Sequence, residues 1–531
     1  LANITEVHIN NNEKHMALSA ITRANLELTE TFRRREKKGS LLWVLDKTRT
    51  AMGKRKLRQW VCEPLTDVAG ILQRQNAVEE LVLDPVLRSQ LTEALSAVSD
   101  LERVATRIVY GTVNPKELKS LSAALKAIPA LRELLGGVRS GMLRAICAGM
   151  DPNEALVELL DRAIAEDPPF SVREGGMIRD GYNEELDSLR GIVNGGAAFL
   201  EKIEREEQER TGIKKLKIGY NRVFGYYIEV LNTYKDLVPD NYIRKQTLTN
   251  CERYITPELK ELESRVLGAQ ERIVKLEYAL FCDIREFAAS RQLALRQTGD
   301  RAAALDVLCS LARVAEENGY VRPNVDLSDV IEIREGRHPV VEKFLEGLPF
   351  VPNDTSMNGT DSRTLIITGP NMAGKSTYMR QTALIVLLAQ IGSFVPAASA
   401  SIGVVDSIFT RIGAADDLAA GQSTFMTEMS EVAAILANAT SRSLIILDEI
   451  GRGTSTFDGM SIARAVLEYV NEPKKIGAKT LFATHYHELT EIEHELAGVK
   501  NYNTSVKKRG EEITFLRRIV PGPADGSYGI E

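Results

Sequence analysis

Apolar residues recur at intervals of three and four from residue 14 to about residue 210, which predicts that this part of the chain is almost entirely helical. One apolar stripe runs from Asn183 to Arg210 and is followed by Gly212, a residue type that commonly caps helices. Another runs from Thr256 and Pro257 to Phe287, so a capping residue and a first-turn proline mark its start. We predict two long amphipathic helices that pack as antiparallel arms, the second of them ~40 residues and ~60 Å long.

Between the two arms, the period changes from helical to strand-like. Apolar and polar positions alternate through two short runs, which predicts a small β-rich insertion at the end of a helical arm. The apolar positions of these runs are Leu216, Ile218, Tyr220, Tyr226, Ile228 and Val230.

Charge also distinguishes this insertion from the rest of the chain. The whole chain has a net charge of −6, yet residues 210–253 hold nine basic residues against four acidic ones, a local charge of +5. Seven aromatic residues lie between Tyr220 and Tyr254. A basic and aromatic module on a long arm favours contact with nucleic-acid phosphates. The alternative is a solvated surface whose tyrosines fill a small core.

After Val321, the pattern is that of an α/β domain. Thr364–Thr368 is strand-like and precedes a glycine-rich loop and a helix, and the continuous apolar run Ser443–Leu447 is typical of a strand buried in a parallel sheet. Lys479–Ala483 predicts another such strand. The fold class we predict is therefore multidomain, with an all-α core and lever that carries long helical arms, a small β-rich insertion and an α/β domain.

Length and composition narrow the class of protein. At ~100–200 residues per domain, 531 residues suggest three or four domains. We find no run of ~18 apolar residues and no signal peptide, and we therefore expect no membrane partner. Five dispersed cysteines without a CxxC pair indicate reduced thiols in the cytoplasm. The sequence starts without Met and stops without terminal punctuation, so we expect a fragment at both ends.

The loop after the first predicted α/β strand fits the phosphate-binding pattern GxxxxGK[ST]. Its residues are Gly369, Pro370, Asn371, Met372, Ala373, Gly374, Lys375, Ser376 and Thr377. Glycines let backbone N–H groups approach phosphate oxygens, Lys375 would neutralise the β/γ charge, and the Ser376 hydroxyl would reach Mg²⁺. A strand before the loop and a helix after it, with its positive dipole end at the phosphates, are the context that this motif requires.

Two carboxylates follow a later apolar strand. Asp448 would hold Mg²⁺, and Glu449 would orient or deprotonate an attacking water. His485, after the next strand, could sense the γ-phosphate or that water, although a lone histidine is more often structural. His487 and Glu488 give only a weak metal signal. Alone, the two carboxylates could end an ordinary strand; together with the glycine loop they indicate nucleotide hydrolysis.

The segment Ser423–Glu431 could open a helix. Its first N–H groups could meet a phosphate bound by another subunit. From its residues alone it could equally be the start of a plain capped helix.

Several segments together resemble the MutS family of bacterial DNA mismatch repair proteins. They are residues 368–381, 423–429, 447–459 and 483–489 in the α/β part and 220–229, 244–248 and 252–259 in the insertion, and the resemblance covers essentially the whole chain. It implies a dimeric, P-loop ATPase of the ABC type that uses ATP/ADP and Mg²⁺ and whose clamps embrace double-stranded DNA at the ends of lever helices. It also implies a homodimer partner, a MutL-like downstream protein and a cytoplasmic, nucleoid-associated location.

The resemblance assigns roles by position in the family's motifs. Lys375, Ser376, Asp448, Glu449 and His485 take the roles given above, and the remaining loop residues bind nucleotide. Ser423 would complete the ATP site of the partner subunit, and Phe350 matches the family's adenine-stacking aromatic. The candidates for contact with DNA phosphates are Lys217, Asn221, Arg222, Arg244, Lys245 and Arg253.

The same resemblance divides the chain into domains. Residues 1–12 would end a connector, 13–177 and 269–320 would form the helical core and lever, 178–268 the DNA clamp, and 321–531 an ATPase domain truncated at its C-terminus. The sequence contains neither the family's mismatch-reading N-terminal domain nor its C-terminal helix-turn-helix. We therefore expect loose DNA binding without mismatch discrimination, and weak dimerisation.

Other function classes remain open. A DNA-binding module whose nucleotide is a switch, like the junction-binding MutS paralogues, would lack the mismatch reader naturally, although Met372 and Ala373 fit the mismatch-repair branch better. A chromosome-arm ATPase would have longer coiled coils and a Leu-Ser-Gly-Gly-Gln signature. An ABC transporter is disfavoured by the clamp-like insertion.

Overall fold

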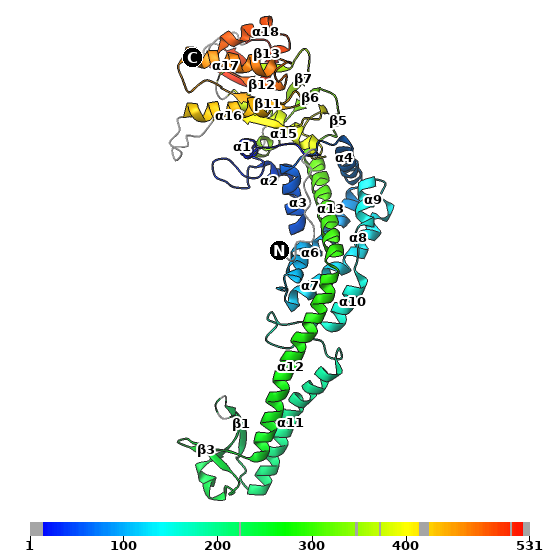
Figure 1. The fold of residues 1–531 in the computed structure, drawn as a ribbon, viewed down its shortest axis with the longest axis vertical. Coiled ribbons are helices and arrows are strands. Elements are labelled where there is room, and N and C mark those ends of the chain that lie inside the picture. The colour runs from blue at the N-terminus through cyan, green and yellow to red at the C-terminus, as the bar shows by residue number, and fades with distance from the viewer. Residues whose placement is uncertain are drawn as a thin grey trace. The chain divides into compact units, whose positions relative to one another are not determined.

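The structure is a computed structural model that describes residues 14–221, 223, 225–345, 349–370, 373–413, 424–509 and 512–523 (Figure 1). The chain divides into two compact units. The first unit comprises Leu1–Ala97, Pro129–Met150 and Gly299–Glu531, and the second comprises Val98–Ile128 and Asp151–Thr298.

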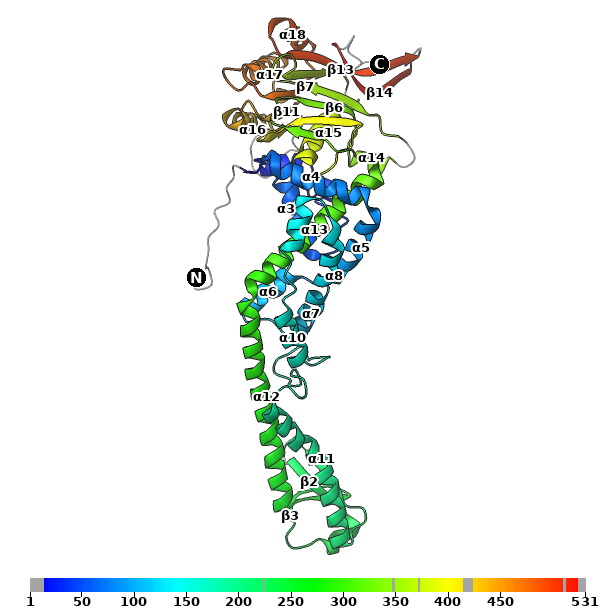
Figure 2. The same ribbon diagram turned by 90° about the vertical axis from the view of Figure 1, so that its right-hand side faces the viewer.

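Two long helices lie side by side in the second unit, α11 (Glu184–Thr211) and α12 (Pro257–Ser290) (Figures 1 and 2). Gly212 ends α11 with a φ of 73°, a left-handed conformation that glycine adopts without strain. The Thr256 side chain accepts a hydrogen bond from the Leu259 N–H at the start of α12, and Pro257 follows it in the first turn. The caps at Gly212 and Thr256 are therefore those that the sequence predicts.

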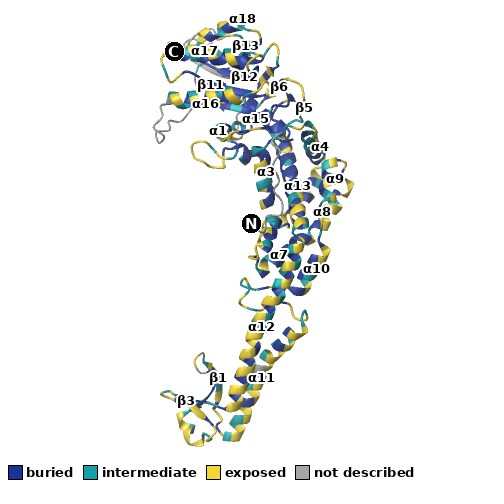
Figure 3. Cartoon of the chain, viewed as in Figure 1, coloured by how far each residue is buried: buried dark blue, intermediate teal, exposed yellow. Residues whose placement is uncertain are grey.

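The helix α12 is shorter than the ~40 residues expected from the apolar stripe. It has 34 residues and its C-cap is Arg291, after which α13 (Gln292–Asn318) begins. Against α11, it buries Leu262 and Val266 on Ile203. A buried carboxylate, Glu277 of α12, also pairs with Arg190 of α11 at 2.6 Å. Figure 3 shows buried and exposed positions interleaved along α12, as an amphipathic helix requires.

Between α11 and α12 the chain forms a four-stranded antiparallel sheet with the order β1-β2-β4-β3. Its strands are β1 (Lys217–Asn221), β2 (Gly225–Leu231), β3 (Ile243–Thr247) and β4 (Cys251–Ile255). A small core under the sheet holds Ile213, Leu216, Ile228, Val230, Tyr242, Tyr254 and Leu259. The strand-like alternation between the two arms is thus confirmed, and two of the tyrosines do fill a core.

The other helices that precede α11 are short. Those of the first unit or its border are α1 (Ala20–Asn25), α2 (Leu41–Leu45), α3 (Ala51–Cys62), α4 (Val68–Leu83), α5 (Pro85–Ser96), α8 (Ile128–Leu134) and α9 (Gly141–Ala148). Those of the second unit are α6 (Leu101–Val109), α7 (Pro115–Lys126) and α10 (Glu154–Ala163). The described part of residues 14–210 is mostly helical as predicted, but residues 26–40 and the stretch between α10 and α11 are irregular.

The first unit also contains two sheets from the C-terminal half of the chain. A mixed sheet has the order β5-β9-β6-β7, from β5 (Asn324–Asp326), β6 (Ile331–Gly336), β7 (Asn353–Met357) and β9 (Ser399–Gly403). A larger sheet has the order β10-β11-β12-β8-β13-β14, from β8 (Thr364–Thr368), β10 (Ile408–Arg411), β11 (Leu444–Asp448), β12 (Lys479–Ala483), β13 (Val499–Arg509) and β14 (Glu512–Pro521). In the larger sheet, the strands from β10 to β13 are parallel and β14 is antiparallel to β13.

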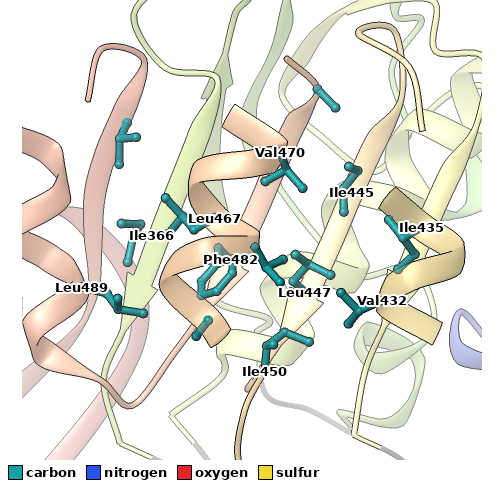
Figure 4. Close-up of a cluster of buried hydrophobic side chains, with 14 of the residues drawn as sticks. Ile366, Val432, Ile435, Ile445, Leu447, Ile450, Leu467, Val470, Phe482 and Leu489 are labelled. Carbon is teal, nitrogen blue, oxygen red and sulfur yellow. The ribbon is translucent and has the colours of Figure 1, made fainter. Parts of the chain in front are cut away.

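Helices cover the larger sheet. On one face, α16 (Thr424–Asn438) contributes Val432 and Ile435, and α17 (Thr456–Asn471) contributes Leu467 and Val470, to a core that includes Phe482 of β12 (Figure 4). The helix α15 (Lys375–Gln390) contacts β11 and β12 and also β6 of the mixed sheet. Two short helices, α14 (Val341–Phe344) and α18 (Ile492–Glu495), complete this part. Continuous apolar strands are buried on both faces, as the pattern in the sequence predicts.

The structure also bears on two expectations drawn from composition, the state of the cysteines and the absence of a membrane-spanning helix. All five cysteines are free thiols, in keeping with their dispersed positions. In the ranges that the structure describes, none of the helices is both long and apolar enough to cross a membrane.

Candidate functional site

The carboxyl ends of three neighbouring strands, β8, β11 and β12, meet at one edge of the larger sheet. In the strand register, Asp448 pairs with Ala483, and Ala483 pairs with Ile367. Backbone bonds continue past the strand ends, because the Glu449 N–H donates to the Ala483 carbonyl at 3.0 Å and the Thr484 N–H to the Ile367 carbonyl at 3.1 Å. The parallel order therefore brings the glycine loop, the two carboxylates and His485 to one place, as expected of such a sheet.

The glycine loop joins β8 to α15. Gly369 and Gly374 have φ values of 136° and 103°, which favour glycine. A Cβ on Gly369 would lie 2.0 Å from Thr504 Oγ1, so the close backbone approach also excludes a side chain there. Ala373 is buried, Thr377 lies in the first turn of α15, and Pro370 lines a cavity of about 430 Å³ with residues of β13 and β14. Asn371 and Met372 lie outside the described residues.

Lys375 is the first residue of α15, and its side chain is largely buried. Its Nζ donates to the carbonyl oxygens of Gly369 at 2.6 Å and Pro370 at 3.0 Å, so the ammonium is held inside the loop. Burial lowers the pKa of Lys375 from its usual value, while Glu449 and Asp448 act in the opposite direction. A cation in this position is suited to neutralise an anion that the loop binds.

Asp448 is buried at the end of β11, and burial raises the pKa of its carboxyl above the usual value. The Ser376 hydroxyl is hydrogen-bonded to this carboxyl, which partly offsets the effect of burial. Its Oδ1 has no hydrogen-bond partner among the described residues. Buried polar atoms are normally paired, so this oxygen fits a ligand that the protein itself does not supply. Carboxylate and hydroxyl oxygens side by side are the donors that Mg²⁺ prefers.

Glu449 has both carboxylate oxygens engaged. His485 Nε2 lies 2.5 Å from Oε1, and Arg452 lies 2.6 Å from Oε2. The hydrogen bond from His485 is the largest cause of a lowered pKa for Glu449. The residue also adopts a φ of 57°, which is unusual for a side chain other than glycine and turns the chain sharply after β11. Sequence reasoning found Glu449 and His485 but not their direct contact, and it missed Arg452 although this residue lies in the same motif.

Two further candidates lie apart from this edge or outside the described residues. Phe350 lines a shallow depression with Asn318, Arg337 and Lys343, and none of the described residues of the glycine loop lines it. Ser423 lies outside the described residues, although α16 begins at Thr424, where the sequence predicts a helix start. The roles assigned to Phe350 and Ser423 therefore stay predictions.

On the antiparallel sheet of the second unit, the predicted DNA-contacting residues fall into two groups. Lys217, Arg244 and Lys245 are exposed, and Lys245 occupies the register shift between Arg244 and Gln246 in β3. Arg253 is instead partly buried, with its guanidinium bonded to Glu229 at 3.2 Å and stacked over Tyr227 at 4.3 Å from the ring centroid.

The hairpin between β1 and β2 holds the remaining two candidates. Asn221 Oδ1 accepts a hydrogen bond from the Val223 N–H at 2.8 Å, which stabilises the turn. Arg222 lies outside the described residues.

Comparison with known proteins supports the resemblance seen in the motifs. The profile of MutS domain III matches residues 21–312, and that of MutS domain V matches residues 365–531. The chain is 55% identical to the DNA mismatch repair protein MutS of Acetivibrio thermocellus over 531 residues, which is 100% of this chain and 61% of that protein. It is 56% identical to the protein of the same name from Ruminiclostridium cellulolyticum over 519 residues, 98% of this chain and 60% of that protein. The chain thus spans about three fifths of the length of these curated relatives.

Proposed function

The chain belongs to the MutS family, and from this premise we propose that it is a DNA mismatch repair ATPase that hydrolyses ATP to ADP and phosphate and couples this reaction to a clamp on duplex DNA. One observation carries the proposal. At a single sheet edge, a glycine loop holding Lys375 lies beside a buried carboxylate, Asp448, with an unpartnered oxygen, and beside the Glu449–His485 pair. Anion-binding backbone, cation, metal ligand and base are the parts that phosphoryl transfer requires.

Each residue has a distinct task in this reaction. The loop and the first turn of α15 bind the phosphates through backbone N–H groups, and Lys375 exchanges its carbonyl partners for the β/γ oxygens. Ser376 and Asp448 would hold Mg²⁺, which neutralises charge on the β/γ oxygens when bound. Glu449 orients the attacking water and accepts its proton as the water oxygen bonds to the γ-phosphorus and the bond to ADP breaks.

His485 and Arg452 fix Glu449 for this task. The His485 hydrogen bond lowers the pKa of Glu449 and so favours the ionised form that a glutamate already has at neutral pH. With both oxygens already bonded, its rotamer is restricted before water arrives. Such preorganisation is the usual source of catalytic advantage in a polar site.

The rest of the proposal follows the family resemblance. Ser423 completes the ATP site of a second subunit in a homodimer, and Phe350 stacks on adenine. Residues 178–268 form the DNA clamp, 13–177 and 269–320 the core and lever, 321–531 the ATPase domain and 1–12 the end of a connector. A MutL-like protein is the downstream partner.

Backbone contact with duplex DNA is assigned to the antiparallel sheet. Exposed lysines on a small, well-packed sheet are suited to phosphates, since phosphate contacts require positive charge and not a base-shaped surface. We therefore propose binding that depends on the DNA backbone and not on sequence.

ATP turnover of the chain and three variants tests the proposal. Lys375→Ala should lose at least about a hundredfold in turnover, the scale on which loss of a group that stabilises developing charge is felt. Glu449→Gln should keep ATP binding but lose turnover, because the amide cannot accept the proton. Lys474→Ala removes an exposed lysine of the same unit and should leave turnover unchanged. Unchanged turnover in Lys375→Ala would refute the proposal.

A further inference from the structure

Gly451, two residues after Glu449, is held at both its backbone N–H and its carbonyl oxygen. Its N–H donates to Glu428 Oε1 of α16 at 2.6 Å. Its carbonyl accepts a hydrogen bond from the Tyr486 hydroxyl, next to His485, at 3.1 Å. Residues from three separate parts of the chain therefore meet at one residue, Gly451, beside the proposed base.

The backbone at Gly451 is closely packed and leaves no space for a side chain. Gly451 has a φ of 87°, and a Cβ placed on it would lie 2.3 Å from the Gly459 carbonyl oxygen in α17. A Cβ on Gly453 would lie 3.2 Å from Phe425 Cβ, so α16 touches the same turn a second time. The turn after Glu449 is thus wedged between α16 and α17.

The hydrogen bond that Glu428 accepts from the Gly451 N–H is of the strong, charge-assisted kind. The Glu428 side chain is 5% exposed, and Arg411 at the end of β10 lies 3.5 Å from its Oε2. Arg411 also lies 3.1 Å from Glu431, one turn later on α16. A buried carboxylate whose charge is balanced by arginine makes a charge-assisted bond to a backbone N–H, and removing it leaves that N–H unpaired.

We propose that Glu428 and Tyr486 are positioning residues that set the turn carrying Glu449, so that the proposed base is oriented only when α16 is seated. This inference rests on the proposed function. Its consequence is a link within one subunit, because α16 is the helix that the proposed function places against the nucleotide of the partner. Any displacement of α16 pulls on Gly451 and, through two peptide bonds, on Glu449.

The test compares substitutions that differ in whether they reach the turn. Glu428→Ala removes the acceptor, whereas Glu428→Gln keeps an oxygen for the Gly451 N–H. Glu431→Gln is the matched control, since Glu431 shares Arg411 but makes no hydrogen bond to the turn in the described part of the chain. ATP turnover, ATP affinity and hydrogen–deuterium exchange of a peptide spanning residues 449–455 are measured on the full chain for each.

We expect Glu428→Ala to lose about tenfold or more in kcat, the scale on which misplacement of a reacting group is felt, with ATP affinity changed less than about twofold. Its amides in residues 449–455 should exchange faster. Glu428→Gln should recover most of the turnover, and Glu431→Gln should match the unaltered chain in both readouts. Tyr486→Phe should also lower kcat, as Glu428→Ala does.

Two results would overturn the inference. One is equal behaviour of Glu428→Ala and Glu431→Gln, which would reduce Glu428 to a partner of Arg411. The other is faster exchange at residues 449–455 with full turnover, which would separate the turn from catalysis. If the unaltered chain turns over no ATP, the proposed function itself fails, and the inference fails with it.

Discussion

The salt dependence of DNA binding should be set by only some of the cations on the antiparallel sheet. Arg253 is bonded to Glu229 and to Gln246, at 3.2 and 3.0 Å, and stacks on Tyr227. Arg244 reaches the buried Glu252 at 3.5 Å, and Lys235 reaches the same carboxylate at 3.0 Å. These three cations already have carboxylate partners. We therefore expect them to neutralise few DNA phosphates and to displace few of the counterions condensed on the DNA.

Four other cations of the sheet region are exposed and have no ion pair in the part of the chain that is described: Lys214, Lys215, Lys217 and Lys245. Each phosphate neutralised contributes about −0.9 to the slope of log K against log salt, so four give about −3.6. Affinity should then fall about 150-fold between about 50 and 200 mM salt. Lys245→Gln should reduce the slope by about one unit, and Arg253→Gln should leave it unchanged while loosening the sheet.

The assay is fluorescence anisotropy of a labelled matched duplex titrated with the chain at several salt concentrations. Thermal unfolding of each variant serves as the control that separates lost stability from lost phosphate contacts. A flat salt response would remove the sheet from the DNA interface. An Arg253→Gln slope as shallow as that of Lys245→Gln would show that ion pairing within the sheet does not decide which cations bind phosphate.

Two further predictions concern stability. Burial lowers the pKa of His338 from 6.5 to about 3, so the folded chain loses stability as pH falls from 6.5 towards 3, where only the unfolded chain binds the proton. Between about pH 7.5 and 5.5, the free energy of unfolding should fall by roughly 1.4 kcal/mol. His338→Asn, whose oxygen can still accept from the Val340 and Val341 N–H groups, should remove this fall when urea midpoints are compared at the two pH values. An unchanged pH dependence in the variant would contradict the assignment. Gly459→Ala places a Cβ 2.2 Å from the Gly451 carbonyl oxygen and should lower the free energy of unfolding by about 1–3 kcal/mol. The Cβ of Gly268→Ala in α12 meets nothing within 4 Å, so this variant should be neutral or stabilising. Equal urea midpoints for the two variants would refute the steric argument.

Local signals in the sequence predicted local structure well. The strands β8 and β12 begin and end at the predicted residues, because continuous apolar runs bounded by polar residues define a buried strand. The break between α12 and α13 at Arg291 was not predicted, since neither proline nor glycine lies there. A helix break without a breaker residue cannot be read from the apolar periodicity, which continues across it.

Contacts between distant residues are the part that the sequence could not supply. The motif order placed Glu449 and His485 after neighbouring strands and gave both a role at the same water, but it did not predict the direct contact between them. Nothing in the sequence pairs Glu428 or Tyr486 with Gly451, since each contact depends on how α16 and the turn after β12 pack. Likewise, counting charges gave the basic insertion but not which arginines would be neutralised by neighbouring carboxylates.

The antiparallel sheet is inserted between the C-terminal end of α11 and the N-terminal end of α12, two helices that pack on each other. Its core is built from its own strands and the residues that flank them. The sheet could therefore be replaced by another segment without disturbing the packing of the two helices. A short turn in its place would close a plain helical hairpin, whose own seam of Ile203, Leu262 and Val266 would remain. Substitutions in the antiparallel sheet can therefore change what the sheet binds without changing the register of any strand that supports the glycine loop.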